Sequence, residues 1–155
     1  MKSFQVFESP IGPLTLARQD DALTHLLFGR VELPGCEEKD AEPLRQAVSQ
    51  LREYFAGTRR VFDVPLAPQG TAFQLRVWEA LLEIPYGETR TYRDIAERVG
   101  CPKGYRAVGM ANHHNPISIL VPCHRVVGAD GSLTGYGGGL HIKEKLLALE
   151  KSNLA

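Results

Sequence analysis

The chain has few cysteines and no long apolar run. Its 155 residues include three cysteines, Cys36, Cys101 and Cys123, an odd number without a CxxC pair. This argues against a disulfide framework and against a thiolate zinc site, and it suits a reducing cytosol. No uncharged apolar run is long enough to span a bilayer, and the first five residues lack the apolar core of a signal peptide. We therefore expect a cytoplasmic protein with no membrane segment and no metal site.

A net charge and the common nucleotide-binding motifs are also missing. The 18 basic and 18 acidic residues cancel, but residues 1–70 hold 8 basic and 10 acidic ones, whereas residues 71–155 hold 10 and 8. Residues 89–125 are locally basic, as a small phosphate-contacting surface requires, although most such windows are only solvated surface. The glycine-rich run 135–139 lacks the Lys-Ser/Thr of a P-loop and the spacing of a dinucleotide fingerprint. We expect no cofactor.

The hydrophobic pattern predicts an α/β (α+β) fold of two lobes. The N-terminal lobe, residues 1–70, reads as a small β-sheet plus a helix over 42–55. Alternating apolar residues predict strands at 4–7, 14–16, 23–28 and 62–66. No motif in this lobe carries chemistry, so we expect it to support the second lobe, residues 71–155.

The C-terminal lobe reads as mainly helical. Thr71 and Gln74 form the pattern of a capping box at the start of its first helix, and a last helix is expected over 142–151. Between them, a helix over 91–99 and a second over 102–112 are joined by a glycine-containing turn, which matches a helix-turn-helix. Small residues on the second helix allow close approach to another surface: Ala107, Gly109 and Ala111. A tight helix pair inside the protein fits this pattern equally well.

The apolar run 117–121 leads through Pro122 to Cys123 and His124. We expect the run to be a buried strand or strand-like segment. Burial alone raises the pKa of a thiol and makes it inert, whereas a neighbouring base can turn it into a nucleophile. Glu150 shares the apolar side of the last helix and needs a partner, for which His124 and an arginine are both suitable. The pattern leaves open a structural cysteine, a cysteine hydrolase and a redox thiol enzyme.

These motifs together resemble the O6-alkylguanine-DNA alkyltransferase family, the methylated-DNA–protein-cysteine methyltransferases. The resemblance rests on Tyr-Arg-Ala-Val-Gly at 105–109, Asn-Pro at 115–116 and Pro-Cys-His-Arg-Val-Val at 122–127, in this order. It is dense over residues 71–151 and looser over the N-terminal lobe. It implies DNA repair by direct damage reversal: a monomer binds double-stranded DNA in the minor groove through the helix-turn-helix and flips the damaged base. The alkyl group of O6-alkylguanine, or of O4-alkylthymine, then passes irreversibly to Cys123, so each molecule reacts once.

The resemblance also implies roles for single residues. Cys123 is the alkyl acceptor, His124 takes its proton through a water molecule, and Glu150 holds the histidine. The other residues that it assigns to the DNA or to the extruded base are Tyr92, Arg106, Ala107, Gly109, Asn115, Val126, Tyr136 and Gly137.

Five of these roles are specific. Arg106 is expected to enter the base stack in place of the guanine, and Tyr92 to help rotate the nucleotide and hydrogen-bond the purine ring. Asn115 is expected to tether the segment around the site, and the Val126 carbonyl to accept from the guanine amino group. Tyr136 lies in the loop expected to cover the extruded base.

One position departs from the family pattern. Gly137 stands where members commonly carry a hydroxyl residue, so it offers only its backbone N–H to the guanine oxygen. Together with the neighbouring glycines, it predicts a roomy pocket that tolerates alkyl groups larger than methyl, such as benzyl. The main alternative is a non-catalytic alkyltransferase-like binder of alkylated DNA. Such proteins lack the acceptor cysteine, whereas this chain has Cys123.

Overall fold

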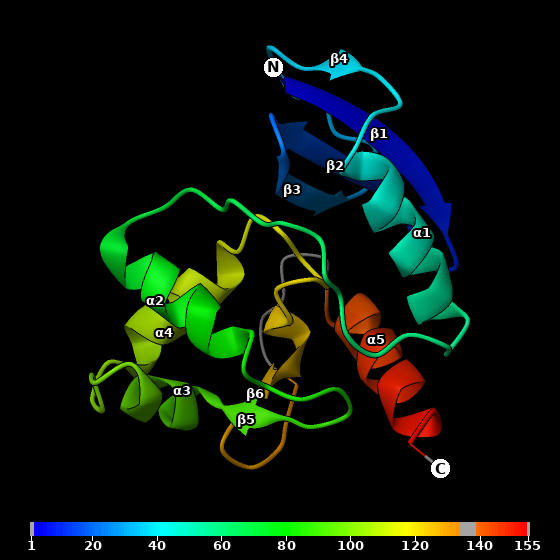
Figure 1. Ribbon diagram of the computed structural model, residues 1–155. Helices are drawn as coiled ribbons and strands as arrows, with labels where there is room; N and C mark the ends of the chain where they lie inside the picture. Colours follow the sequence, from blue (N-terminus) through cyan, green and yellow to red (C-terminus); the bar gives the residue numbers. More distant parts are fainter. Residues whose placement is uncertain (1, 134–138, 155) are drawn as a thin grey trace. The chain divides into compact units, whose positions relative to one another are not determined.

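The chain divides into two compact units, Met1–Gln69 and Gly70–Ala155, and the computed structural model describes residues 2–133 and 139–154 (Figure 1). The first unit combines a small sheet with one helix, and the second is mainly helical. This arrangement confirms the predicted α/β fold class.

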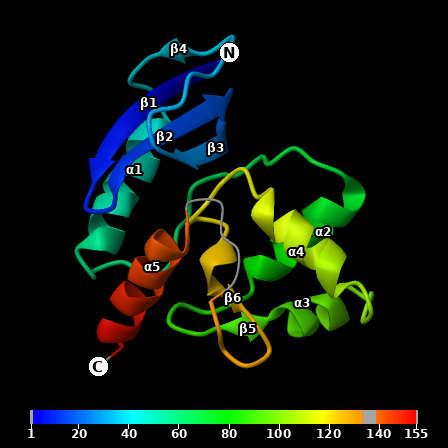
Figure 2. The same ribbon diagram turned by 180° about the vertical axis from the view of Figure 1, so that it is seen from behind.

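A short antiparallel meander forms the sheet of the first unit. The strands β1 (Lys2–Ser9), β2 (Gly12–Gln19) and β3 (Ala22–Phe28) pair in sequence, and the two-residue β4 (Glu37–Glu38) lies parallel to β1 at the edge. The helix α1 (Leu44–Phe55) lies against β1 and β2 (Figure 2). The fully buried side chains of this unit include Leu14, Leu16, Leu26, Leu44, Leu51 and Tyr54. Their burial drives the helix onto the sheet.

The strand predicted at 62–66 is wrong. Only Leu66 pairs, in an isolated parallel bridge with Leu23. The Leu23 N–H donates to the Pro65 carbonyl at 2.9 Å, and the Ala67 N–H donates to the Leu23 carbonyl at 2.8 Å. Because Pro65 has no N–H to give, the pairing cannot extend to the residues before Leu23.

The second unit begins with α2 (Ala72–Leu81), which starts at the predicted capping box. The Gln74 N–H donates to Thr71 Oγ1 at 3.1 Å, and the Thr71 N–H donates to Gln74 Oε1 at 2.9 Å. Near the other end of the helix, Trp78 Nε1 donates to the Ala111 carbonyl at 2.8 Å. This bond joins α2 to the helix that contains Ala111.

Two short helices follow where the helix-turn-helix was predicted: α3 (Tyr92–Arg98) and α4 (Tyr105–His113). A second capping box, between Thr91 and Asp94, starts α3. Gly100, with φ +78°, takes the left-handed conformation that ends it. The second helix begins three residues later than predicted, because the Gly104 N–H closes a turn on the Cys101 carbonyl.

The chain then returns to the centre of this unit. The 3₁₀ turn η1 (Cys123–Arg125) leads into β6 (Val126–Val127), which pairs in parallel with β5 (Arg90–Thr91), and α5 (Leu140–Ser152) closes the unit. Figures 1 and 2 both show η1 between the α2–α4 pair and α5. The turn that Cys123 opens therefore lies between helices of the second unit and contacts α2 and α5.

The apolar run 117–121 is buried as predicted but is not a strand. Its backbone is coiled, with the Val121 N–H donating to the Ile117 carbonyl at 3.0 Å and the Leu120 N–H to the Ser118 carbonyl at 2.9 Å. Ile119 has φ +72°, which is rare for a β-branched residue and indicates local strain. Apolar residues that are all buried look alike in sequence whether the backbone is extended or coiled.

Candidate active site

Cys123 opens η1 directly after Pro122. Its side chain is 3% exposed, and its N–H donates to the Val121 carbonyl at 2.7 Å. Both the thiol and the backbone that carries it are thus held inside the second unit. The other two cysteines of the chain are partly exposed and lie away from η1 in the sequence.

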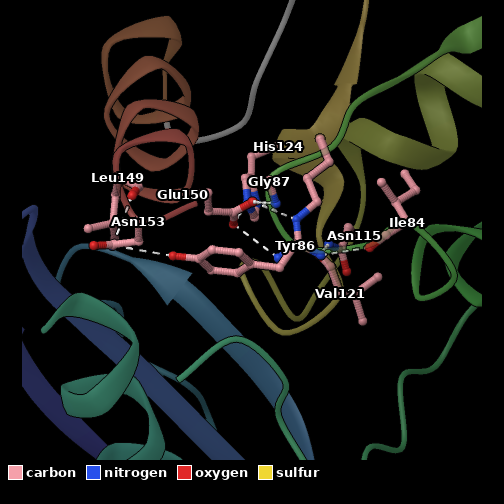
Figure 3. A network of polar contacts seen from close by, with 10 residues as sticks. Ile84, Tyr86, Gly87, Asn115, Val121, His124, Leu149, Glu150 and Asn153 are labelled. Carbon is pink, nitrogen blue, oxygen red and sulfur yellow. Dashed lines mark hydrogen bonds and ion pairs between the residues drawn. The ribbon is translucent and has the colours of Figure 1, made fainter. Parts of the chain in front are cut away.

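Glu150 holds the residue next to the cysteine. Its Oε2 lies 2.6 Å from His124 Nε2, and both side chains are fully buried. Arg125 binds the same carboxylate with two nitrogens, Nε to Oε1 at 2.8 Å and Nη2 to Oε2 at 3.0 Å. The Gly87 N–H adds a fourth bond, to Oε1 at 3.1 Å. Figure 3 shows the carboxylate between His124 and the Tyr86–Gly87 turn. Both sequence-level alternatives for the partner of Glu150, histidine and arginine, are realised together.

This network keeps Glu150 ionised. Burial alone raises the pKa of its carboxyl group, but the hydrogen bonds and charges of His124 and Arg125 together lower that pKa well below its usual range. Arg125 is in turn fixed by donation from Nη1 to the Ile84 carbonyl at 2.8 Å. The buried carboxylate therefore has a permanent cation beside it.

His124 is neutral and has a defined tautomer. Burial lowers the pKa of its imidazole, and the charges of Arg125 and Lys143 lower it further, against the opposing effect of Glu150. Because an ionised carboxylate can only accept, His124 Nε2 must carry the proton and Nδ1 must carry the lone pair. Nδ1 is buried and has no hydrogen-bond partner among the described residues. A base oriented in this way, one residue from a thiol, is suited to remove the thiol proton.

Lys143 is a charged residue of the site that the sequence reasoning missed. Its side chain is fully buried, and Nζ donates to the Val126 carbonyl. Burial lowers the pKa of Lys143 to about 8, partly opposed by attraction to Cys123. The same attraction favours a negative charge on the sulfur. Lys143 lies seven residues before Glu150, on one helical face, and this spacing was the signal that could have revealed it.

Asn115 ties the coiled run to itself. Its Nδ2 donates to the Val121 carbonyl at 2.8 Å, and its Oδ1 accepts from the Ile117 N–H at 3.0 Å. The side chain is 7% exposed. It thereby bridges the two ends of the segment that leads into Cys123.

Four more of the predicted residues lie on the two helices of the helix-turn-helix. Arg106 and Ala107 are exposed on α4, and Tyr92 is half-buried at the start of α3. A methyl group placed on Gly109 would meet the Tyr92 ring at 3.9 Å, which is an ordinary contact. Val126 is fully buried. Arg106 is therefore accessible from solvent, whereas the ring of Tyr92 lies against Gly109 of the neighbouring helix.

Two predicted residues, Tyr136 and Gly137, lie outside the described residues. Within residues 2–133 and 139–154, no cluster of three or more histidine, cysteine or acidic side chains could hold a metal ion. In the same ranges, none of the helices has the length and hydrophobicity needed to cross a bilayer.

Comparison with known proteins decides the family. The model of the 6-O-methylguanine DNA methyltransferase DNA-binding domain matches residues 72–152, and that of the ribonuclease-like domain of the same methyltransferase matches residues 3–68. The chain belongs to this family. The resemblance seen in the sequence is thus confirmed.

Similar proteins cover almost the whole chain. A methylated-DNA–protein-cysteine methyltransferase from Methanosarcina barkeri is 54% identical over 97% of this chain and 98% of its own length. One from Mycobacterium tuberculosis is 54% identical over 98% of this chain and 94% of its own. A crystal structure of the M. tuberculosis protein OGT in complex with DNA is 53% identical, with a TM-score of 0.92, covering 97% of this chain and 94% of that one.

Proposed function

We propose that this protein repairs alkylated DNA by moving an alkyl group from O6-alkylguanine to Sγ of Cys123. The observation that carries the proposal is the arrangement at η1: a buried thiol is followed by a neutral histidine whose Nε2–H is fixed on Glu150. Only Nδ1 of that histidine is left to act as a base. Membership of the methyltransferase family gives this base a substrate class.

The transfer needs only the residues at the site and water. The thiol proton passes to His124 Nδ1 through a water molecule, and the thiolate attacks the alkyl carbon in line with the bond to the guanine oxygen. The S–C bond forms as the C–O bond breaks, and the electron pair of the C–O bond stays on the guanine. The guanine takes up a proton from water, and His124 returns the thiol proton to water, so no proton is gained or lost overall. No described group can expel the alkyl group from the resulting thioether, so each molecule acts once. O4-alkylthymine would react by the same displacement.

DNA binding is assigned to the helix-turn-helix. The exposed Arg106 enters the base stack from the minor groove, while Ala107 and Gly109 let α4 lie close to the DNA. Base extrusion costs a few kcal/mol, least where alkylation has already weakened the pair. The degenerate chemical pattern of the minor groove suits a protein that must not depend on sequence. We place this activity in the cytoplasm and assign it to a monomer.

The extruded base is held by residues around η1. Tyr92 hydrogen-bonds the purine ring, and the Val126 carbonyl accepts from the guanine amino group as well as from Lys143, since a carbonyl oxygen has two lone pairs. Asn115 fixes the segment before the cysteine. Tyr136 and the Gly137 N–H complete the pocket in this proposal.

Intact-mass measurement tests the proposal. Incubation with duplex DNA containing O6-methylguanine is expected to add one methyl group per molecule, located on Cys123. The variant Cys123→Ser should gain none and should still bind the DNA, whereas Cys101→Ser, the matched control, should react like the wild type. DNA binding by the wild type without a mass gain would instead indicate a non-catalytic binder, and repeated turnover of esters or disulfides would indicate another thiol enzyme.

A further inference from the structure

The inner face of α4 carries one polar side chain, Asn112. The residues that α4 presents to solvent include Arg106 and Met110, whereas Val108, Ala111 and Asn112 are buried. Asn112 is 3% exposed. A polar group in such a position normally needs partners for both its donor and its acceptor.

The donor of Asn112 has a partner on the alkyl acceptor residue. Nδ2 donates to the carbonyl oxygen of Cys123 at 3.3 Å, and this oxygen also accepts from the Val126 N–H. The orientation of the amide follows from this contact, because Oδ1 in the same place would set two acceptors against each other. In the described part of the chain, Oδ1 then has no partner and is buried.

The end of α4 that carries Asn112 is firmly held. Trp78 Nε1 donates to the carbonyl of Ala111, the preceding residue, and so anchors this turn of α4 on α2. Arg106 lies six residues earlier on the same helix, about 9 Å along its axis. One rigid helix therefore carries both the exposed arginine and the contact with the Cys123 peptide.

Stability alone does not account for an asparagine here. A leucine, which branches at the same carbon although it is somewhat larger, would leave no buried acceptor unpaired, and such acceptors are costly. What only the amide supplies is a directed bond to the backbone of the cysteine.

We propose that Asn112 is a positioning residue for alkyl transfer: its amide fixes the Cys123 peptide to α4, so that the sulfur is aimed at the base that α4 delivers. This inference rests on the proposed function. In-line displacement is sensitive to small misplacements of the reacting atoms, so loosening of the cysteine backbone slows the chemical step.

The test compares Asn112→Leu with Val108→Ala, which alters another buried residue of the same helix face. Asn112→Leu is expected to slow methyl transfer about tenfold or more, both from methylated duplex and from free O6-methylguanine. Its affinity for unmethylated duplex should stay within about twofold and its Tm should change little, because loss of the bond to the Cys123 carbonyl is offset by removal of the unpaired buried acceptor. With free base, the limiting rate should fall while the half-saturating concentration stays unchanged. Val108→Ala should lower the Tm and leave the transfer rate nearly unchanged.

Each other outcome overturns the inference. Transfer by Asn112→Leu close to the wild-type rate on both substrates would show that the amide does not position the cysteine. A loss with duplex alone would assign Asn112 to DNA binding, and an equal loss in Val108→Ala would indicate general loosening of α4. If the leucine variant does not fold, Asn112→Ala is measured in the same way. Failure of the proposed function is separate, since the wild type itself would then gain no methyl group.

Discussion

Glu150 decides the protonation of its neighbours. By accepting from His124, Arg125 and the Gly87 N–H, it fixes the proton of His124 on Nε2 and leaves Nδ1 free of one. Without Arg125, the buried carboxylate would raise the pKa of His124 and favour an imidazolium, which cannot act as a base. Arg125 therefore acts on the chemistry indirectly. Its positive charge compensates the negative charge of Glu150, which would otherwise favour protonation of His124.

Replacement of His124 tests the base directly. His124→Gln is expected to slow methyl transfer from free O6-methylguanine by roughly 10²-fold or more, the usual contribution of a general base. Because the pKa of His124 is lowered, the wild-type rate should persist below pH 6.5, the ordinary pKa of histidine, whereas the variant should depend on spontaneous thiol ionisation and gain rate as pH rises. The measurement is the rate of mass gain from pH 5 to 9. The exposed His141→Gln is the control, and a variant with the wild-type rate and pH profile would exclude His124 as the base.

The chemistry of single residues was more predictable than their partners. The neighbouring Cys123 and His124 and the inward position of Glu150 follow from the sequence. Lys143 was missed, and the arginine expected beside Glu150 was not identified as Arg125, because long cationic side chains are normally exposed and only the folded chain shows which ones are buried with partners. The orphaned acceptor of Asn112 also depends on an atomic arrangement that no spacing encodes.

At the scale of elements, α4 has two opposite faces with different tasks. Its outer face exposes Arg106 and Met110, and its inner face contacts α2 and the Cys123 peptide. The helix is short, and its position depends on these contacts more than on intrinsic propensity. A movement of α4 would therefore displace the Cys123 peptide directly.

Replacement of Arg106 distinguishes base extrusion in duplex DNA from the alkyl-transfer step itself. Arg106→Ala should slow repair of methylated duplex by roughly tenfold to a hundredfold, since it loses the group that compensates for the unstacked base. Reaction with free O6-methylguanine should stay within about twofold, because no base needs to be extruded. Rates of mass gain with the two substrates give the comparison. Arg76→Ala on α2 removes the same charge elsewhere in the unit and should affect neither rate; equal losses on both substrates in Arg106→Ala would contradict its role as a wedge.

Periodic elements could be predicted from the sequence, and irregular ones could not. The helices of both units and the β1–β2–β3 meander lie where periodicity places them. The largest errors fall at 62–66 and 117–121, where prolines lie within or directly beside the apolar residues. There the pairing partners and a strained residue, Ile119, decide the backbone, and both are set by tertiary contacts.

Across the whole molecule, the site is built at a cost to stability. Lys143 is fully buried and Ile119 has a strained backbone, and both belong to the unit that carries Cys123. The first unit has an apolar core of leucines and one tyrosine with no comparable buried charge among the residues named in its core. We infer that the second unit trades stability for reactivity, as active sites commonly do.

The pH dependence of unfolding makes this cost measurable at Lys143. Its pKa is about 8 in the folded protein and 10.5 in the unfolded chain, so between these values the unfolded chain binds more protons. Stability contributed by this group therefore rises with pH from 8 to 10.5 and is constant below 8. The gain from pH 7 to pH 10 should be roughly 2 kcal/mol.

The variant Lys143→Met lacks this titration, so the free energy of unfolding of the wild type minus that of the variant should increase by this amount over the same range. Denaturant unfolding of both proteins at pH 7 and pH 10 measures it, and the common titration of tyrosines and other lysines cancels in the difference. A pH-independent difference would mean that Lys143 keeps its ordinary affinity for protons in the folded protein.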